Sequence, residues 1–122
     1  MSVLLNAVGQ ERSDIAKLLI NNGADVNARD SGGWTVLMFT SDTSVAELAI
    51  NKGADVNAKE NYGVSVVSLA SSHGYTDMVK FLIQKGADVN ARDKANRTAI
   101  NYASHYGYSN IVQILKDAGA TE

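Results

Sequence analysis

The hexapeptide Gly-Ala-Asp-Val-Asn-Ala occurs three times, at Gly23–Ala28, Gly53–Ala58 and Gly86–Ala91. A truncated copy, Gly119-Ala120, follows further along the sequence. The glycines of successive copies are 30, 33 and 33 residues apart. A string that returns at a period of about 33 residues indicates an array of structural repeats, each with two short helices and a turn. The copies of the hexapeptide therefore allow the rest of the chain to be aligned repeat by repeat.

Length and composition predict one globular domain. The chain has 122 residues, of which 45% are hydrophobic and 20% are charged, so it can bury a real core. It has no cysteine, which excludes disulfides and thiolate metal sites, and we expect an intracellular, cytoplasmic protein. The formal net charge of −2 argues against a broad nucleic-acid-binding surface. No apolar run is long enough to predict a membrane span, so no membrane contact is expected.

The third repeat, residues 60–92, has the most regular pattern. Ser65 stands where the N-cap of a first helix is expected, and Gly74 ends that helix. Thr76 is predicted to cap a second helix with apolar residues at helical spacing. Gly86 then terminates the second helix in the left-handed conformation.

The fourth repeat, residues 93–122, follows the same plan. Thr98 and Ser109 are predicted to cap its two helices. Asn96 replaces the glycine of the turn, and asparagine tolerates the left-handed region better than other non-glycine residues. Lys116 stands where the second and third repeats carry isoleucine, which fits a repeat that caps the array.

The second repeat, residues 30–59, is three residues short, and alignment places the gap between Ser41 and Asp42. This position lies between the two predicted helices, so we expect a tightened turn or a shortened first helix. Thr43 or Ser44 remains available as the cap of the second helix.

The first repeat, residues 1–29, is partial and is expected to start inside its first helix. Val3, Leu4 or Leu5 is therefore expected to be partly exposed. Together the four repeats form one predicted domain spanning residues 1–122.

These features together resemble the ankyrin repeat family over nearly the whole chain. The residues that carry the resemblance are the three hexapeptides, the turns Asp30…Gly33…Thr35, Glu60…Gly63…Ser65 and Asp93…Asn96…Thr98, and the steps Gly74-Tyr75 and Gly107-Tyr108. The resemblance implies an all-α solenoid of four helix-turn-helix units, the first and last partial, linked by β-turn or hairpin-like loops.

The chain departs from the family's Thr-Pro-Leu-His-x-Ala motif in every repeat. The matching segments are Thr35–Thr40, Ser65–Ala70 and Thr98–Ala103, and none contains the proline or the histidine. Met38, Ser68 and Asn101 replace a histidine that ties neighbouring repeats together in the family. We therefore expect modest stability for an array of this length.

Polar residues of the hexapeptide are predicted to be structural. Asp25, Asp55 and Asp88 follow the terminating glycine, where a short carboxylate bonds local backbone N–H groups. The asparagines two positions on, Asn27, Asn57 and Asn90, are expected to make similar local bonds.

No catalytic residue, cofactor or metal site is expected. His73 and His105 occupy equivalent repeat positions and lack the spacing of a metal-binding motif. The glycines belong to turns and helix ends rather than to a phosphate-binding loop. An enzyme or metal protein built on the two histidines would require both imidazoles to converge on one ion.

The resemblance implies a protein-interaction module that binds an unidentified partner protein, as a monomer, through a concave face of turn tips and first helices. Residues that vary between repeats at those positions are the candidates. They are Arg29, Ser31, Trp34, Lys59, Asn61, Tyr62, Val64, Ser72, His73, Arg92, Lys94, Arg97, His105 and Tyr106. The positive charge of the fourth tip favours an acidic partner segment there.

Two alternatives remain open at this level. Trp34 either anchors a partner or lies over the neighbouring loop tip or the irregular second repeat, and the basic residues either bind a partner or pair with the adjacent acids. The second alternative concerns the whole chain. Instead of an interaction module, it is a spacer from a longer array or an engineered scaffold without its own partner. The irregular gap in the second repeat favours a natural sequence.

Overall fold

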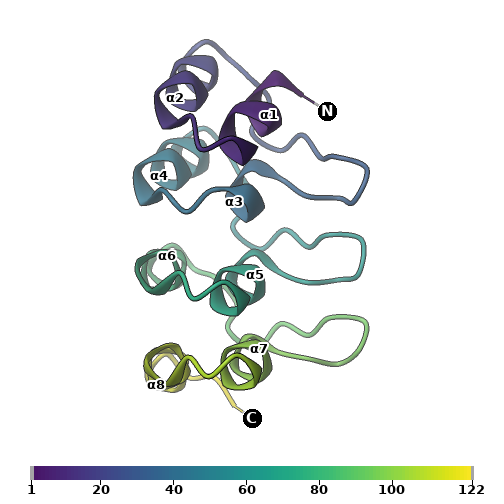
Figure 1. Cartoon of the computed structure of the whole chain (residues 1–122), viewed down its shortest axis with the longest axis vertical. Coiled ribbons are helices and arrows are strands. Elements are labelled where there is room, and N and C mark those ends of the chain that lie inside the picture. Colours follow the sequence, from purple (N-terminus) through teal and green to yellow (C-terminus); the bar gives the residue numbers. More distant parts are fainter. Residues whose placement is uncertain (1, 122) are drawn as a thin grey trace. The chain divides into compact units, whose positions relative to one another are not determined.

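The computed structural model describes residues 2–121, and this part of the chain forms eight α-helices and no strand (Figure 1). The all-α prediction is confirmed. The helices are α1 (Val3–Gly9), α2 (Ser13–Asn21), α3 (Val36–Phe39), α4 (Thr43–Asn51), α5 (Val66–Ser72), α6 (Thr76–Gln84), α7 (Ala99–His105) and α8 (Ser109–Asp117). The chain divides between Asp55 and Val56 into two compact units, each with two helix-turn-helix repeats.

In the first unit, α1 packs on α2 and α3, and α2 packs on α4. The hydroxyl of Ser2 accepts a hydrogen bond from the Leu5 N–H at 3.1 Å and so caps α1. Leu4 and Leu5 are buried, whereas Val3 is 69% exposed. The expected exposure at this end of the repeat therefore falls on Val3 alone.

The three residues that the second repeat lacks shorten its first helix. Helix α3 has only four residues, and the backbone leaves it extended at Thr40, where ψ is 141°. This places Asp42 rather than Thr43 or Ser44 at the cap of α4, so the sequence-based prediction of the cap is wrong. The Asp42 carboxylate accepts from the Ser44 N–H at 2.9 Å and from the Ser44 hydroxyl at 2.6 Å.

In the second unit, α5 packs against α7 and α6 packs against α8. Ser65 caps α5 as predicted, since its hydroxyl accepts from the Ser68 N–H at 3.2 Å. Thr76 and Ser109 are the first residues of α6 and α8 rather than their caps, so that prediction is wrong by one residue. The Thr76 hydroxyl accepts instead from the Asn110 side chain at 3.1 Å, which joins the starts of the two helices.

The hexapeptide glycines adopt positive φ values between 91° and 98°, as terminators of the second helices should. The aspartates behave as predicted where Asp25 and Asp88 accept from the backbone N–H two residues on, at 2.9 Å.

The asparagine side chains make bonds between repeats that the sequence did not suggest. Each reaches from its own hexapeptide to the next copy, donating to the glycine carbonyl and accepting from a backbone N–H just beyond it. The pairs are Asn27 with Gly53 and Asp55, Asn57 with Gly86 and Asp88, and Asn90 with Gly119 and Thr121. These bonds hold consecutive repeats in register within each unit.

Loops precede the first helices of repeats two to four, and we call residues 29–35, 59–65 and 92–98 the finger loops. In each unit the first helices lie between the second helices and the finger loops (Figure 1). An isolated antiparallel bridge between Lys59 and Ser65 closes the base of the second of these loops. Among the helices of residues 2–121, none is long and apolar enough to cross a membrane.

Candidate protein-interaction surface

Each finger loop is built around one acidic side chain. Asp30, Glu60 and Asp93 each accept two backbone N–H bonds from residues two and four positions later, at 2.7–2.9 Å. The turn residue between those donors has positive φ, as at Gly63 (78°) and Asn96 (65°). The predicted survival of the turn at Asn96 is therefore confirmed. These bonds fix the loop backbone before any partner arrives.

The first basic residue of each finger loop also supports a loop backbone. Arg29 donates to the Gly33 carbonyl at 2.8 Å, and Arg92 donates to the Asn96 carbonyl at 2.9 Å. The Lys59 ammonium donates to the carbonyl of Arg92 at 3.3 Å, which links the two fingers of the second unit. All three basic side chains lie at the surface.

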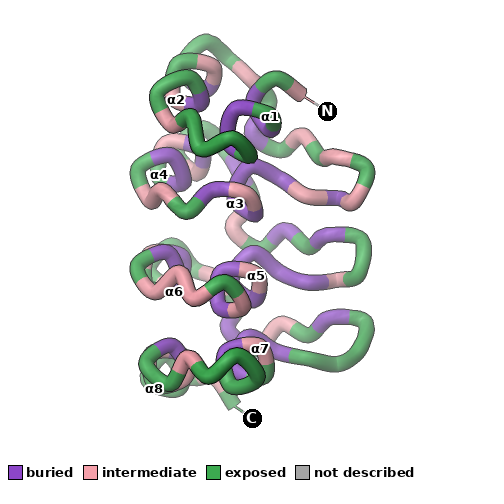
Figure 2. The backbone as a smooth tube through the Cα atoms, viewed as in Figure 1, coloured by how far each residue is buried: buried purple, intermediate pink, exposed green. Residues whose placement is uncertain are grey.

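The fingers of the second unit are also joined through their backbones. The Lys94 N–H donates to the Tyr62 carbonyl at 3.0 Å. A Cβ atom at Gly63 would lie 3.2 Å from that same Lys94 nitrogen, so glycine suits both the close approach and the positive φ at this position. Ser31 and Asn61 are exposed at their finger tips. Figure 2 shows exposed tips on these loops and buried residues where each loop enters its first helix.

Exposed aromatic and histidine side chains gather on the second unit. Tyr62 is 73% exposed on its finger, and Tyr106 is 56% exposed after the end of α7. His105 meets the Tyr106 ring edge-on with centroids 4.8 Å apart. His73 is exposed and stacks on Tyr75 with centroids 5.2 Å apart.

Three candidates have roles inside their own repeats. Val64 is only 7% exposed, so its side chain belongs to the core rather than to the surface that the sequence suggested. Ser72 is half-buried and donates its hydroxyl hydrogen to the Leu69 carbonyl at 2.7 Å. Trp34 is half-buried and lies 5.1 Å from the Phe39 ring, between centroids, so α3 supports it within its own repeat.

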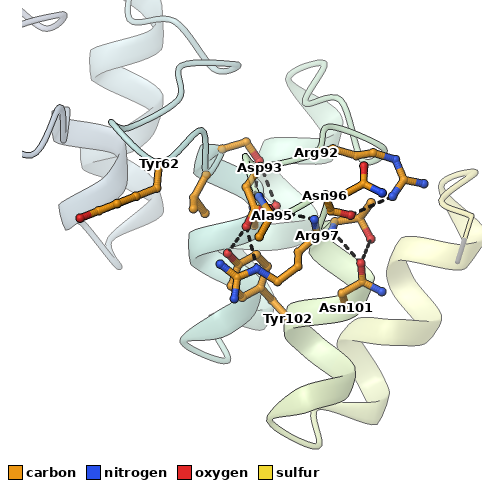
Figure 3. A network of polar contacts seen from close by, with 12 residues as sticks. Tyr62, Arg92, Asp93, Ala95, Asn96, Arg97, Asn101 and Tyr102 are labelled. Carbon is orange, nitrogen blue, oxygen red and sulfur yellow. Dashed lines mark hydrogen bonds and ion pairs between the residues drawn. The ribbon is translucent and has the colours of Figure 1, made fainter.

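A polar cluster of Asp93, Arg97 and Tyr102 joins the fourth finger to α7 (Figure 3). The second carboxylate oxygen of Asp93 accepts from Arg97 Nε at 3.0 Å and from the Tyr102 hydroxyl. The Arg97 guanidinium carbon lies 5.2 Å from the centre of the Tyr102 ring. Together with its two backbone bonds, the buried Asp93 carboxylate therefore has four donors.

Sequence reasoning missed Tyr102 because the position holds Phe39 and Leu69 in earlier repeats, where an apolar packing residue is the simplest interpretation. The signal that could have found it is its hydroxyl. A tyrosine at a half-buried helical position needs a polar partner, and Asp93 begins the same repeat.

The cluster shifts the ionisation of all three groups. Burial raises the pKa of Asp93, but the hydrogen bonds from Tyr102 and Arg97 outweigh it and leave this pKa below the usual value. Burial and the bond to Asp93 raise the pKa of Tyr102 to about 12. The hydrogen bond to Asp93 also raises the pKa of Arg97. At neutral pH the cluster therefore holds an ionised carboxylate, a guanidinium and a neutral phenol.

Beside this cluster lies a pocket of about 320 Å³, lined by Arg97, Asn101, Tyr102, His105 and Tyr106. Three of these residues are candidates from the sequence, and the structure brings them together. Asn101 is itself held to the start of α7, because its side-chain oxygen accepts from the Thr98 N–H at 2.8 Å and from the Thr98 hydroxyl at 3.1 Å.

Asn101, Ser68 and Met38 show what replaces the missing motif histidine. Asn101 and Met38 each accept from the backbone N–H of their own helix cap. The Ser68 hydroxyl accepts instead from the Ser65 hydroxyl at 3.1 Å. These contacts stay within one repeat.

Residues 2–121 contain no group of three histidine, aspartate, glutamate or cysteine side chains arranged to hold a metal ion. The two histidines instead contact different tyrosines, Tyr75 and Tyr106.

Comparison with known families agrees with the repeat geometry. A family model for ankyrin repeats in three copies matches residues 39–121, and a single ankyrin repeat model matches residues 1–31. No curated protein matches the sequence. Ankyrin repeats are generally protein–protein interaction modules and are typically not enzymes. The matched segments, the paired helices and the finger loops lead to one conclusion, that this chain belongs to the ankyrin repeat family.

Proposed function

We propose that this chain binds a partner protein through the finger loops and first-helix ends of its second unit, without chemistry of its own. The observation that carries the proposal is the exposure of Tyr62 and Tyr106 on well-supported backbone. Tyrosine and arginine are enriched among the residues that dominate binding energy at interfaces. Lys94, Arg97 and His105 are exposed on the same unit and add polar and charged groups to it.

Rigidity of the loops favours this use. Glu60 and Asp93 fix the two fingers, and the Lys94–Tyr62 backbone bond joins them. A surface that is already ordered loses little conformational entropy when it binds. The exposed side chains therefore act as a preformed contact face for a partner.

The acidic side chains of the finger loops support a binding role without catalysis, because their oxygens already accept hydrogen bonds within the chain. The acidic residues of the fingers accept backbone N–H bonds, and Asp93 has four donors. Trp34 offers a smaller contact on the first unit, where it is half-buried against Phe39.

The test is affinity capture from the source cell with three versions of the chain. They are the native chain, a Tyr62→Ala/Tyr106→Ala variant, and a control Lys80→Ala/Gln113→Ala variant altered on the exposed sides of α6 and α8. All four positions are exposed, so each version should keep its helical circular dichroism.

The expected result is a set of proteins captured by the native chain and the control variant but lost from the tyrosine variant. Equal capture by all three versions would place the binding surface elsewhere. Loss from the control variant alone would assign binding to the second helices and contradict the proposal.

A further inference from the structure

We propose that Arg97 is the specificity-determining residue of this surface, and that it receives an aspartate or glutamate carboxylate from an extended segment of the partner protein. The inference rests on the proposed function and names the chemistry of its partner. It depends on three observations. They are the contacts of the Arg97 guanidinium with Asp93 and Tyr102, the positive charge of the fourth finger loop, and the pocket beside Arg97.

The guanidinium of Arg97 is fixed at one edge and open at the other. Its Nε donates to Asp93 at 3.0 Å, and its plane is backed by the Tyr102 ring 5.2 Å away. Within residues 2–121, its two terminal nitrogens have no acceptor, and the side chain is 55% exposed. A fork held in this way offers two parallel N–H donors, the geometry that matches a carboxylate.

The fourth finger carries an excess of positive charge that the other fingers lack. Arg92, Lys94 and Arg97 stand against a single acid, Asp93, which is buried. The corresponding stretches of the other two finger loops each have one basic and one acidic residue, Arg29 with Asp30 and Lys59 with Glu60. The whole chain has a formal net charge of −2, so this finger is a local positive site on an acidic molecule. Such a local field favours an acidic peptide segment over a polyanion that needs a wide basic surface.

The pocket of about 320 Å³ gives the segment a second contact. Arg97 lines it, while His105 and the 56% exposed Tyr106 supply aromatic surface. A carboxylate on Arg97 would therefore place a neighbouring side chain of the segment against Tyr106. We expect that neighbour to be apolar or aromatic, because aromatic surface gains most from burying such groups.

The test begins with a library of random 12-residue peptides displayed on phage and selected on the immobilised native chain. The most enriched peptide is then synthesised in two forms, as selected and with each Asp and Glu replaced by Asn and Gln. Both forms are titrated against the native chain, Arg97→Lys, Arg97→Gln and the control Arg12→Gln. Arg12 is an exposed arginine that does not line the pocket, so the control removes the same charge and leaves the pocket residues unchanged.

We expect enriched peptides to contain an acidic residue next to an apolar one. Arg97→Lys keeps the charge but loses the fork, so the affinity of the selected peptide should fall about tenfold. Arg97→Gln should weaken binding further, whereas Arg12→Gln should not change it. The neutral form of the peptide should bind all four proteins with the same low affinity.

Several outcomes would overturn the inference. Peptides without acidic residues that bind Arg97→Gln normally, yet are lost on Tyr62→Ala/Tyr106→Ala, would remove the role of Arg97 and leave the proposed function standing. Failure to enrich any peptide would count against both. Equal binding to Arg97→Lys and the native chain would show that charge alone suffices. Tight binding of a single-stranded RNA of random sequence, lost in Arg97→Gln, would assign the site to a different class of partner.

Discussion

At the scale of single residues, Glu11 is the most informative departure from the repeat pattern. It stands where the third and fourth repeats have Gly74 and Gly107, and its φ is +57° against +74° and +77°. Its N–H donates to the Val8 carbonyl at 3.0 Å, as the glycines' N–H groups do in their turns. The turn therefore imposes the left-handed conformation on a residue that has a Cβ atom, at a cost of roughly 1–2 kcal/mol.

Glu11→Gly is expected to raise the free energy of unfolding by roughly 0.5–1 kcal/mol, since the relief of backbone strain exceeds the extra entropy of the unfolded chain. Chemical denaturation monitored by circular dichroism measures this change. Gln10→Gly is the matched control, because Gln10 has φ of −96° and should gain nothing. A Glu11→Gly variant less stable than the native chain would contradict the account of this turn.

The polar residues also show where prediction from sequence stops. The hexapeptide identifies the helix terminators, and the local bonds of Asp25 and Asp88 follow from adjacency in the chain. The bonds of Asn57 and Asn90 join residues about 30 positions apart, so no local rule reveals them. Tyr102 was missed for a different reason, because the apolar residues at the equivalent positions, Phe39 and Leu69, suggested a packing role and not a bond to Asp93.

At the scale of helices, the starts of α5 and α7 explain how the chain folds without proline. Ser65 and Thr98 adopt extended backbone at the caps, and Val66 and Ala99 are the first helical residues. Proline is favoured at that position because its φ is already helical and its missing N–H has no helical partner. The two sites differ in one respect, since the Val66 N–H donates to the Ala58 carbonyl at 3.3 Å.

Ala99→Pro is expected to stabilise the chain by roughly 0.5–1 kcal/mol. Val66→Pro gains the same pre-organisation but loses the bond to Ala58, so its stabilisation should be smaller. Thermal melts of the two variants beside the native chain measure both effects. A fall in melting temperature for Ala99→Pro would show that the buried site cannot accept the larger ring.

The cap of α4 gives this fold a dependence on acid. Hydrogen bonds from Ser44 and Ser13, helped by the charge of Lys17, lower the pKa of Asp42 from 3.8 to about 2. Folding favours the ionised carboxylate of Asp42, so this group stabilises the folded chain fully above about pH 4, near its unfolded pKa of 3.8. This stabilisation is lost as the pH falls toward 2.

Asp42→Asn should therefore be less stable than the native chain at pH 7 and should lose less stability between pH 4 and pH 2. Asparagine remains a good N-cap, so the variant removes the charge while keeping the cap. Urea denaturation at several pH values gives the comparison. Parallel curves for the two proteins through this range would mean that Asp42 does not carry the dependence.

At the scale of the whole molecule, the repeat plan was predictable and the contact surface only in part. Glycine spacing located each pair of helices and the missing residues of the second repeat. Sequence variation pointed to Arg97, His105 and Tyr106, and the structure brings these three to one pocket. It also placed Val64 on the surface, although the bond from its N–H to Glu60 holds this residue at the buried base of the finger. The exposure of a side chain in a loop depends on the direction in which it points from the backbone. Alignment of the repeats does not reveal that direction.

Binding of a partner segment by the fingers and first helices of the second unit would change the surroundings of their backbone amides. Nuclear magnetic resonance of the labelled chain follows these amide signals during titration with the selected acidic peptide. We expect the largest shifts in residues 59–65 and 92–106, with Arg97 and Tyr106 among them. Largest shifts on the exposed sides of α6 and α8, at residues such as Lys80 and Gln113, would contradict this expectation.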